Sequence, residues 1–420
     1  MARTLDVYLH NELTGQLVQD DGGQMAFNYR ESWLNKPGAT ALSQSLPLRK
    51  ARFSRNECRG FFGGILPEET KREIIARNLG ISARNDYAML EQIGGECAGA
   101  VTFIPAGETL PEQHYGYRKL SPDELAAILR ELPKRPLLAG DEGIRLSLAG
   151  AQDKIAVRIE GDDVSLPLDG APSTHILKPA VERFNGVVFN EALCMKLAAA
   201  AGLPAAKAEA RSVDSIDYLL VERYDRTHRP TAGGGAPVLH RIHQEDFCQA
   251  QGVVSEMKYQ KEGGPSLKQC FSLLRQVSGA PVVDLARFLD AVIYNYFVGN
   301  NDAHGKNFSL LYHGIGTGNV EISLAPLYDI VSTIYYPELS QNMAMKIGGE
   351  YSSEKVLPGN FEQLAEEAAL GKPLVKQRVP ELAEIVIAAL EKTDLEHPVA
   401  ASVAALIRAR CEKTRNSFRH

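Results

Sequence analysis

Two short segments of the chain carry side chains suited to chemistry on a bound ligand. Residues 300–307 read Asn-Asn-Asp-Ala-His-Gly-Lys-Asn, and residues 326–329 read Pro-Leu-Tyr-Asp. Asp302 can orient a hydroxyl group or accept its proton, and the side-chain oxygens of Asn307 and Asp329 are ligands that Mg²⁺ prefers. Phosphoryl transfer requires this combination, because a carboxylate orients the attacking hydroxyl while a metal ion bridges the nucleotide phosphates.

The elements expected around these segments favour a site over an ordinary loop. Read alone, a cluster of Gly, Asn and Asp is equally typical of a tight turn. Residues 282–298 carry apolar side chains at helical spacing, whereas 308–312 and 320–324 are predicted strands around a Gly-rich turn. Asp302 and Asn307 have the Asp-x-x-x-x-Asn spacing of a kinase catalytic loop. The order helix, polar loop, hairpin and aspartate is that of a kinase metal site.

A second segment, residues 145–154, leads into a predicted strand at 155–159. A turn of small residues between strands lets backbone N–H groups approach phosphates. The segment has one glycine and departs from the Gly-x-Gly-x-x-Gly of ordinary protein kinases, so a plain hairpin turn is equally consistent with it. Ser147, at the edge of the turn, is a candidate phosphate acceptor. The candidate nucleotide-binding residues of the turn are Ala149, Gly150, Ala151, Gln152, Asp153 and Lys154.

A strand lysine follows the turn. Residues 174–178 read Thr-His-Ile-Leu-Lys, which predicts a strand ending at Lys178. Such a lysine reaches nucleotide phosphates when an acidic residue on a following helix holds it, and Glu191 in the predicted helix 190–202 is placed to do so. Taken alone, a strand lysine is usually a surface charge, so the prediction depends on its companions.

Residues 218–226 read Tyr-Leu-Leu-Val-Glu-Arg-Tyr-Asp-Arg, an apolar strand that turns abruptly polar. In a two-lobed kinase, the segment after a buried strand joins the lobes and offers backbone groups to adenine. Glu222 and Tyr224 are therefore the candidates for an adenine-binding hinge. A strand that simply runs into solvent is equally consistent with this segment alone.

Composition sets the broad class of the protein. A length of 420 residues predicts two or three lobes, and 44% apolar and 23% charged residues are typical of a soluble protein. The net charge of −6 argues against nucleic-acid binding through bulk positive charge. The six cysteines are scattered without a Cys-x-x-Cys pair, and no signal peptide or membrane-spanning run is evident, so we expect buried thiols and a cytoplasmic location.

Three regions follow from these patterns. Residues 1–105 read as an α/β module without a catalytic group. Trp33 and the basic set Arg49, Lys50, Arg52 and Arg55 form either a partner surface or a solvated face. A polar linker at 105–117 opens the second region, 106–226. This region holds the candidate phosphate-binding turn at 145–154, called the phosphate turn, and the candidate hinge at 222–224. The third region, 227–420, is predicted to be mainly helical.

The motifs in this order resemble the HipA family, the kinase toxins of bacterial HipBA toxin–antitoxin modules. The placement of His304 in Asp-x-His-x-x-Asn is also similar to phosphatidylinositol-type kinases. The segments that carry the resemblance span essentially the whole chain. They are Ser43–Leu48, Phe61–Pro67, Leu146–Lys154, Thr174–Lys178, Val221–Arg226, Gln244–Cys248, Asp302–Asn307 and Pro326–Ile330.

The resemblance implies an α+β, two-lobed protein-kinase-like fold of the phosphatidylinositol-kinase type, with a mixed α/β N-terminal lobe and a mainly helical C-terminal lobe. It implies an ATP- and Mg²⁺-dependent protein Ser/Thr kinase that acts on a translation-related protein, typically an aminoacyl-tRNA synthetase. The implied residue roles are these: Asp302, His304 and Lys306 are catalytic, Asn307 and Asp329 bind Mg²⁺, Lys178 contacts nucleotide phosphates, Glu191 supports it, Glu222 and Tyr224 line the adenine site, and Ser147 is autophosphorylated.

The resemblance also implies a partner, a HipB-like helix-turn-helix antitoxin through which the protein reaches operator DNA. Membrane contact is not expected, because the sequence shows no basic or apolar membrane-facing patch. Two alternatives stay open. One is a small-molecule or lipid kinase of the same fold, and the other is a silent nucleotide-binding co-repressor.

Overall fold

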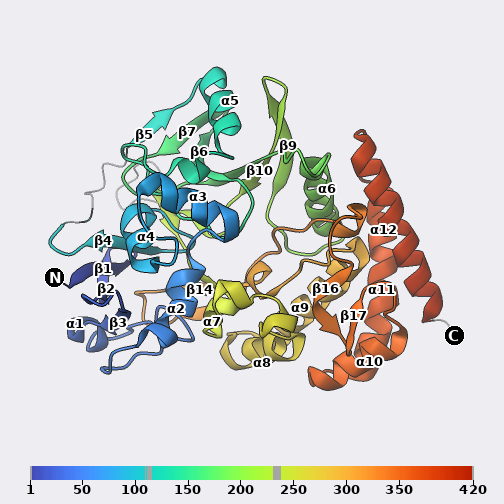
Figure 1. Cartoon of the computed structure of the whole chain (residues 1–420). Coiled ribbons are helices and arrows are strands. Elements are labelled where there is room, and N and C mark those ends of the chain that lie inside the picture. The colour runs from blue at the N-terminus through green and yellow to red at the C-terminus, as the bar shows by residue number, and fades with distance from the viewer. Residues whose placement is uncertain (1, 109, 111–115, 230–237, 419–420) are drawn as a thin grey trace. The chain divides into compact units, whose positions relative to one another are not determined.

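The computed structural model describes residues 2–108, 110, 116–229 and 238–418 (Figure 1). The chain forms two compact units, each built from separate stretches of sequence. Unit 1 comprises Met1–Pro179, Arg211–Glu256 and Leu311–Glu321, and unit 2 comprises Ala180–Ala210, Met257–Leu310 and Ile322–His420. Within the predicted linker at 105–117, residues 109 and 111–115 lie outside the described residues. The division at residues 105 and 226 stays a prediction.

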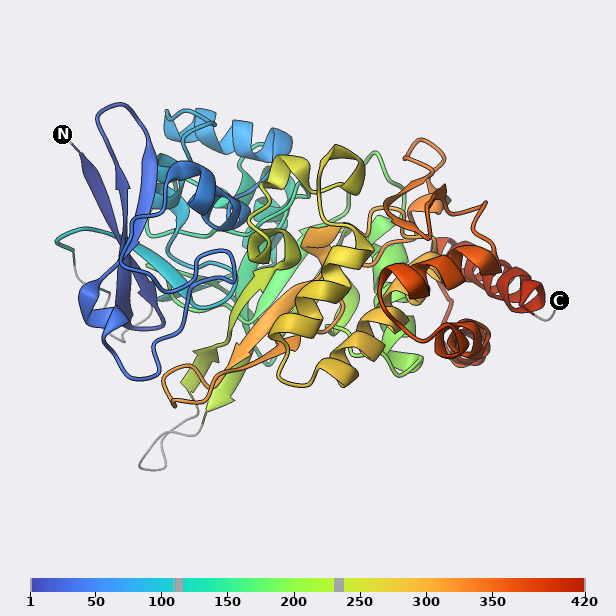
Figure 2. The same ribbon diagram turned by 90° about the horizontal axis from the view of Figure 1, so that it is seen from below.

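Unit 1 begins with an antiparallel sheet in the order β3-β2-β1-β4 (Figure 2). Apolar residues alternate along its strands, and Leu5, Val7, Leu17 and Phe27 are buried. Helices pack beside the sheet and complete this part of the core. The strands are β1 (Arg3–Leu9), β2 (Glu12–Gln19), β3 (Met25–Tyr29) and β4 (Val101–Pro105), and the helices are α1 (Glu31–Leu34), α2 (Arg55–Gly64), α3 (Glu69–Leu79) and α4 (Asp86–Ile93).

The placement of Trp33 corrects the sequence analysis. Only 4% of its surface is exposed, and its indole N–H donates a hydrogen bond to the Thr40 carbonyl at 3.1 Å. Trp33 therefore belongs to the core of unit 1 and cannot form part of an exposed partner surface, because its polar atom and its ring are both satisfied inside.

A second sheet carries the segments predicted to bind nucleotide, and the chain crosses from unit 2 to unit 1 within its strand β9. Its strand order is β5-β7-β6-β8-β10-β9, and β6, β8 and β10 pair antiparallel. The helix before β6 begins at Pro122, where Ser121 and Glu124 form a capping box. The elements are β5 (Tyr117–Lys119), α5 (Pro122–Glu131), β6 (Ile155–Glu160), β7 (Asp163–Pro167), β8 (His175–Pro179), β9 (Ala208–Val213) and β10 (Ile216–Glu222).

Shorter elements follow in unit 1, and the chain crosses between the units within β14 and β15. They are β11 (Arg226–Arg229), β12 (Val238–Arg241), β13 (His243–Asp246), α7 (Phe247–Ala250), β14 (Ser309–His313) and β15 (Glu321–Leu324).

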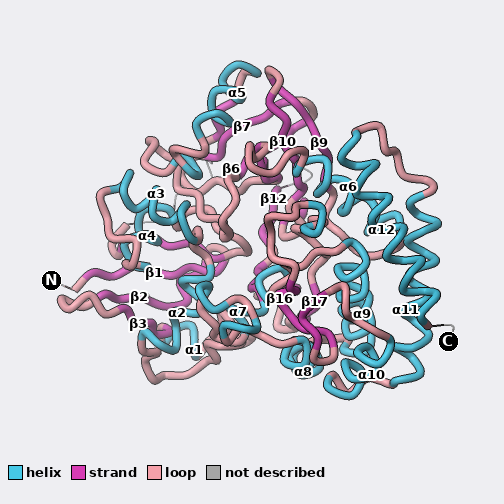
Figure 3. Tube along the Cα trace, turned by 45° about the vertical axis from the view of Figure 1, so that its right-hand side comes forward, coloured by secondary structure: helices cyan, strands magenta, loops and turns pink. Residues whose placement is uncertain are grey.

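Unit 2 is mainly helical, as Figure 3 shows in cyan. Helices α11 and α12 pack side by side, and both contact α9. The predicted helix at 282–298 is confirmed as α9, which begins with Pro281 and ends before Gly299. The helices are α6 (Val187–Ala200), α8 (Leu267–Val277), α9 (Pro281–Val298), α10 (Pro358–Glu367), α11 (Lys372–Leu390) and α12 (Pro398–Ser417), and the hairpin is β16 (Asn342–Ile347) with β17 (Glu350–Ser352).

All six cysteines are buried free thiols, as the sequence analysis expects. Among the residues that the structure describes, no helix has both the length and the apolar character required to cross a bilayer.

Glu245 on β13 is a buried carboxylate with neutral hydrogen-bond donors in unit 1. It accepts hydrogen bonds from Ser43 Oγ at 2.5 Å, from the Gln44 backbone N–H at 3.0 Å and from the Tyr312 hydroxyl. Burial raises its pKa to about 7, more than these hydrogen bonds lower it. Because the folded-state pKa lies above the unfolded one, the protonated form favours folding, and this contribution is lost as pH rises toward 7.

We therefore predict that Glu245→Gln reduces the decline in stability between pH 5 and pH 8, by up to about 3 kcal/mol relative to wild type. The amide keeps the size of the side chain and can accept from Gln44 while donating to Ser43. Urea unfolding at several pH values measures the difference. Parallel pH profiles of the two proteins would contradict the prediction.

Candidate functional site

The polar loop of unit 2 starts at a conformation that only glycine adopts easily. Gly299 caps α9 with a φ of 70°, and its N–H donates to the Tyr296 carbonyl at 3.2 Å. A Cβ at this position would lie 2.3 Å from the Ile334 side chain. The tight cap lets the chain reverse from the helix into residues 300–307 without a spacer.

Amide side chains then fix the start of the loop. Asn300 donates to Asn295 Oδ1 at 2.8 Å, and its own Oδ1 accepts from the backbone N–H of Asp302 at 3.2 Å. The backbone N–H of Asn301 donates to Thr333 Oγ1 at 2.8 Å. All the side chains in this set are buried except that of Asp302, which is exposed. The loop therefore presents the Asp302 carboxylate to solvent on a rigid support.

Tyr259 is a site residue that the sequence analysis missed. Its hydroxyl donates a hydrogen bond to Asp302 Oδ1 at 2.8 Å. Its ring packs edge-on against the His304 ring, with the centroids 5.3 Å apart. No spacing rule connects residues 259 and 302, because the two belong to different loops that meet only in the folded unit.

His304 and Lys306 lie inside the loop, each with 7% of its surface exposed. The His304 backbone N–H donates to Asn307 Oδ1 at 3.1 Å, and the Lys306 carbonyl accepts from the Tyr328 hydroxyl at 2.7 Å. The second bond joins the loop to the segment 326–329. The structure thus brings together the two segments that the sequence singled out for chemistry.

The predicted metal ligands are neighbours in unit 2. Asn307 Nδ2 donates to Asp329 Oδ2 at 3.2 Å. Asp329 has a φ of 58°, an uncommon left-handed conformation that Asp tolerates better than most residues and that recurs at functional sites. An amide and a carboxylate side by side supply the oxygen ligands that fit Mg²⁺. No group of three His, Cys, Asp or Glu side chains suited to a metal occurs in the described part of the chain.

In unit 1, residues of the N-terminal region hold the phosphate turn. The Gly150 carbonyl accepts from the Glu68 N–H at 3.2 Å, and Gly150 has a φ of 106°. Lys154 Nζ donates to the Ala149 carbonyl at 2.7 Å, while Asp153 pairs with Lys71 at 2.6 Å. Ala151 and Gln152, like the rest of residues 149–154, are half-buried.

Ser147 is fully buried before this turn. Its Oγ donates to the Ile65 carbonyl at 3.0 Å, and its backbone N–H donates to the Glu96 carbonyl at 2.9 Å. Phosphorylation of Ser147 would therefore require that the hydroxyl leave the Ile65 carbonyl and become exposed.

Lys178 and Glu191 are both buried, with 6% and 2% of their surface exposed. Lys178 lies on β8 opposite Leu219 of β10, in unit 1. Because Lys178 is buried, the interpretation of this lysine as a surface charge is wrong. A lysine is rarely buried without charged or polar partners. Glu191 lies on α6 in unit 2, and its pairing with Lys178 stays a prediction.

The hinge candidates lie where β10 ends, and the segment does not run into solvent. Glu222 is exposed and Tyr224 half-buried, whereas Arg223 and Asp225 between and after them are buried. The Arg223 backbone N–H donates to the Thr174 carbonyl at 2.9 Å. Alternate residues are therefore anchored inside unit 1, which leaves the side chains of the two candidates outside the core.

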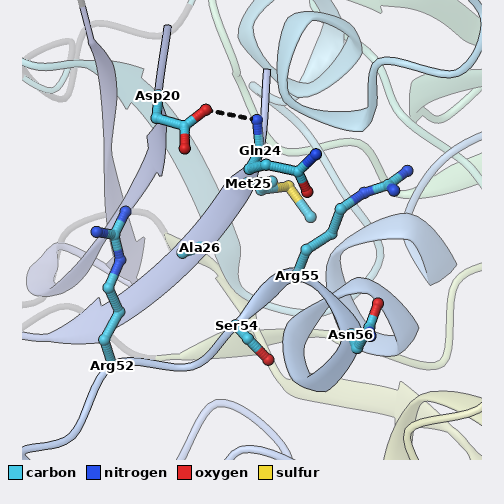
Figure 4. A pocket seen from close by; sticks show the side chains of 8 residues that line it. All are labelled: Asp20, Gln24, Met25, Ala26, Arg52, Ser54, Arg55 and Asn56. Atoms are coloured by element: carbon cyan, nitrogen blue, oxygen red, sulfur yellow. Dashed lines mark hydrogen bonds between the residues drawn. The ribbon is translucent and has the colours of Figure 1, made fainter. Parts of the chain in front are cut away.

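A surface pocket of about 370 Å³ lies elsewhere in unit 1, at the start of β3 and of α2 (Figure 4). In the view of Figure 4 the side chains of Arg52 and Arg55 flank it, and Asp20 accepts a hydrogen bond from the Gln24 N–H at 2.8 Å. Its lining contains none of the predicted site residues. It is lined by Asp20, Gln24, Met25, Ala26, Arg52, Ser54, Arg55 and Asn56.

Comparisons with known proteins agree with these motifs. The chain matches the model of the HipA N-terminal domain over residues 5–104 and that of the HipA-like C-terminal domain over residues 146–392. It is 47% identical over 401 residues to the putative kinase Y4mE of Sinorhizobium fredii, which covers 93% of each chain. It is 28% identical over 430 residues to the serine/threonine-protein kinase toxin HipA of Shewanella oneidensis, with 98% of this chain and 95% of that protein covered.

A solved structure gives the same result for the fold. A chain in the complex of HipA, HipB and operator DNA from Shewanella oneidensis superposes with a TM-score of 0.84 at 26% identity, covering 99% of this chain and 98% of that one. Two family models together span most of the sequence, and the relatives align along nearly its full length. The chain belongs to the HipA family.

Proposed function

We propose that the protein is an ATP- and Mg²⁺-dependent protein Ser/Thr kinase and the toxin of a HipBA-type toxin–antitoxin module. The observation that carries this proposal is the exposed Asp302 carboxylate on a loop that also carries Asn307, whose side chain contacts Asp329 of the segment 326–329. This is the residue set that phosphoryl transfer needs, and it stands in a chain of the HipA family.

In the proposed reaction the substrate hydroxyl oxygen forms a bond to the γ-phosphorus while the bond from that phosphorus to the bridging oxygen breaks and ADP leaves. Asp302 orients the hydroxyl and takes up its proton. Asn307 and Asp329 would hold Mg²⁺, which when bound offsets the charge of the phosphates. We assign His304 and Lys306 of the same loop to the catalytic group with Asp302.

Residues of unit 1 are assigned to the nucleotide. Lys178 would contact the phosphates with support from Glu191, the backbone of residues 149–154 would approach them, and Glu222 and Tyr224 would line the adenine. These assignments correspond to a two-lobed protein-kinase-like fold of the phosphatidylinositol-kinase type. The buried side chain of Lys178 supports this role, because a buried ammonium group calls for a specific acidic partner.

The substrate and the partners are proposed from the family. We infer a translation-related substrate protein such as an aminoacyl-tRNA synthetase, a HipB-like antitoxin, contact with operator DNA mainly through that antitoxin, and a cytoplasmic location. Relatives support this in part, since the similar solved complex contains HipA, HipB and operator DNA. Autophosphorylation of Ser147 is proposed as the silencing step, because a phosphate there would repel the phosphates of the nucleotide.

The kinase proposal predicts that Asp302→Asn abolishes phosphotransfer, with a loss of at least about 10²-fold, and changes the dissociation constant for ATP by less than about threefold. Intact-mass and peptide mass spectrometry after incubation with MgATP measures the first quantity, and calorimetric titration the second. Added phosphate on Ser147 in wild type alone is the expected result.

The matched control is Asp290→Asn, which removes a carboxylate of unit 2 that pairs with Arg378. This variant should keep its phosphotransfer activity. Intact ATP binding in wild type without phosphate on any residue, and without transfer to a candidate substrate, would contradict the kinase proposal and favour a binding protein.

The contact of Tyr259 with Asp302 gives a separate prediction. Tyr259→Phe removes one hydrogen bond to the carboxylate, so kcat should fall by about three- to tenfold. Steady-state kinetics at a fixed pH measures this quantity.

Tyr351→Phe, on β17 of the same unit, serves as the control and should keep the wild-type kcat. If Tyr259→Phe also has the wild-type kcat, the hydrogen bond to Asp302 has no part in the reaction.

A further inference from the structure

Glu96 lies between α4 and β4 in the N-terminal region. Its carboxylate is completely buried, yet it faces three arginines: Arg223 at 3.1 Å, Arg226 at 2.8 Å and Arg241 at 2.5 Å. Burial alone would raise the pKa of Glu96, but the three guanidinium groups lower it to about 2. The carboxylate is therefore charged, and its position is set by charges from a distant part of the sequence.

The side chain of Glu96 holds residues 222–226, the segment to which we assign adenine binding and which we call the adenine segment. Arg223 and Arg226, which bind it, bracket Tyr224 in the sequence. Arg223 also donates to Asp225 at 3.0 and 2.8 Å, and both arginines donate to the Cys97 carbonyl, at 3.0 and 3.1 Å. These bonds fix the backbone on both sides of Tyr224.

Two residues near Glu96, Gly99 and Ser173, add hydrogen bonds to this set of contacts. The backbone N–H of Gly99 donates to Asp225 Oδ2 at 2.7 Å. Ser173, two residues before β8, donates to Glu96 Oε1 through its N–H at 2.9 Å and its Oγ at 2.8 Å. The strand that carries Lys178 is thus tied to the same carboxylate as the adenine segment.

The main chain of Glu96 holds the start of the phosphate turn. Its N–H donates to the Arg145 carbonyl at 2.8 Å, and its carbonyl accepts from the Ser147 N–H at 2.9 Å. These two bonds form a parallel bridge between Glu96 and Leu146. One residue therefore contacts the phosphate turn through its backbone and the adenine segment through its side chain.

We propose that Glu96 is a positioning residue that couples the order of the phosphate turn to that of the adenine segment. The inference rests on the nucleotide-binding roles proposed above. If the side chain loses its partners, the backbone of Glu96 shifts, and the bond to Ser147 is the first contact of the phosphate turn to weaken. The N-terminal region thereby acts on nucleotide binding without touching the nucleotide.

The decisive experiment substitutes Arg223, which binds Glu96 from the adenine segment, and measures hydrogen exchange at the Ser147 amide of the phosphate turn. Arg223→Lys keeps a positive charge but cannot donate to Glu96 and Asp225 together. Hydrogen–deuterium exchange of the full-length protein without nucleotide reports on the Ser147 amide. We expect exchange of peptides that contain this amide to accelerate at least about fivefold.

Nucleotide affinity gives the second readout. With Asp302→Asn added to prevent turnover, Arg223→Lys and Glu96→Gln should each weaken ATP binding at least about fivefold, measured by titration calorimetry. Glu96→Asp, which retains the charge, should recover part of the affinity. Should Glu96→Gln fail to fold, Arg223→Lys and Glu96→Asp still decide the outcome.

Two control variants separate positioning from general loss of stability. Glu245→Gln changes another buried carboxylate of unit 1 that binds Ser43 and Gln44, and Leu17→Ala creates a cavity in the first sheet. Both should leave exchange at Ser147 within about twofold of wild type. Equal acceleration in Leu17→Ala at a matched loss of Tm, or unchanged exchange in Arg223→Lys, would overturn the coupling. A wild-type protein that binds no ATP would instead refute the proposed function, since the exchange measurement needs no nucleotide.

Discussion

Two carboxylates and three guanidinium groups share the interior of unit 1. Glu96 and Asp225 are fully buried among Arg223, Arg226 and Arg241, and the group joins residues that lie up to about 145 positions apart in the sequence. Burying a charge is costly unless it is paired, and removing one member of such a group typically costs about 3–5 kcal/mol. The hinge, the start of β8 and the phosphate turn therefore depend on this cluster for their relative positions.

The cluster also explains why a strongly polar segment stays inside the protein. Residues 222–226 contain four charged side chains. Two of them are paired inside, because Arg223 donates hydrogen bonds to both Asp225 and Glu96. The pKa of Asp225 is held well below its usual range, because Arg223 and Arg226 outweigh the effect of burial. The alternation that results leaves Glu222 and Tyr224 outside the core, as a segment that contacts a ligand requires.

Unit 2 supports its polar loop by different means. Neutral amides and hydroxyls, those of Asn295, Asn300 and Thr333, hold the backbone around Asp302. Hydrogen bonds from these neutral groups fix the backbone of the loop that carries Asp302. In unit 1, by contrast, buried ion pairs fix the backbone of residues 223–226.

The sequence by itself determined the elements and motifs that depend on local pattern. Helical periodicity located α9, and short apolar runs bounded by polar or Gly-rich segments located β8, β10 and β14, because each pattern involves neighbouring residues. Motif spacing brought Asp302, Asn307 and Asp329 into one hypothesis and indicated the HipA family. Only the tertiary structure decided that Tyr259 binds Asp302, that Glu96 binds the hinge, and that Ser147 and Trp33 are buried. These contacts join residues 43 to 127 positions apart in the first two cases, and such distant pairing leaves no periodic trace in one sequence.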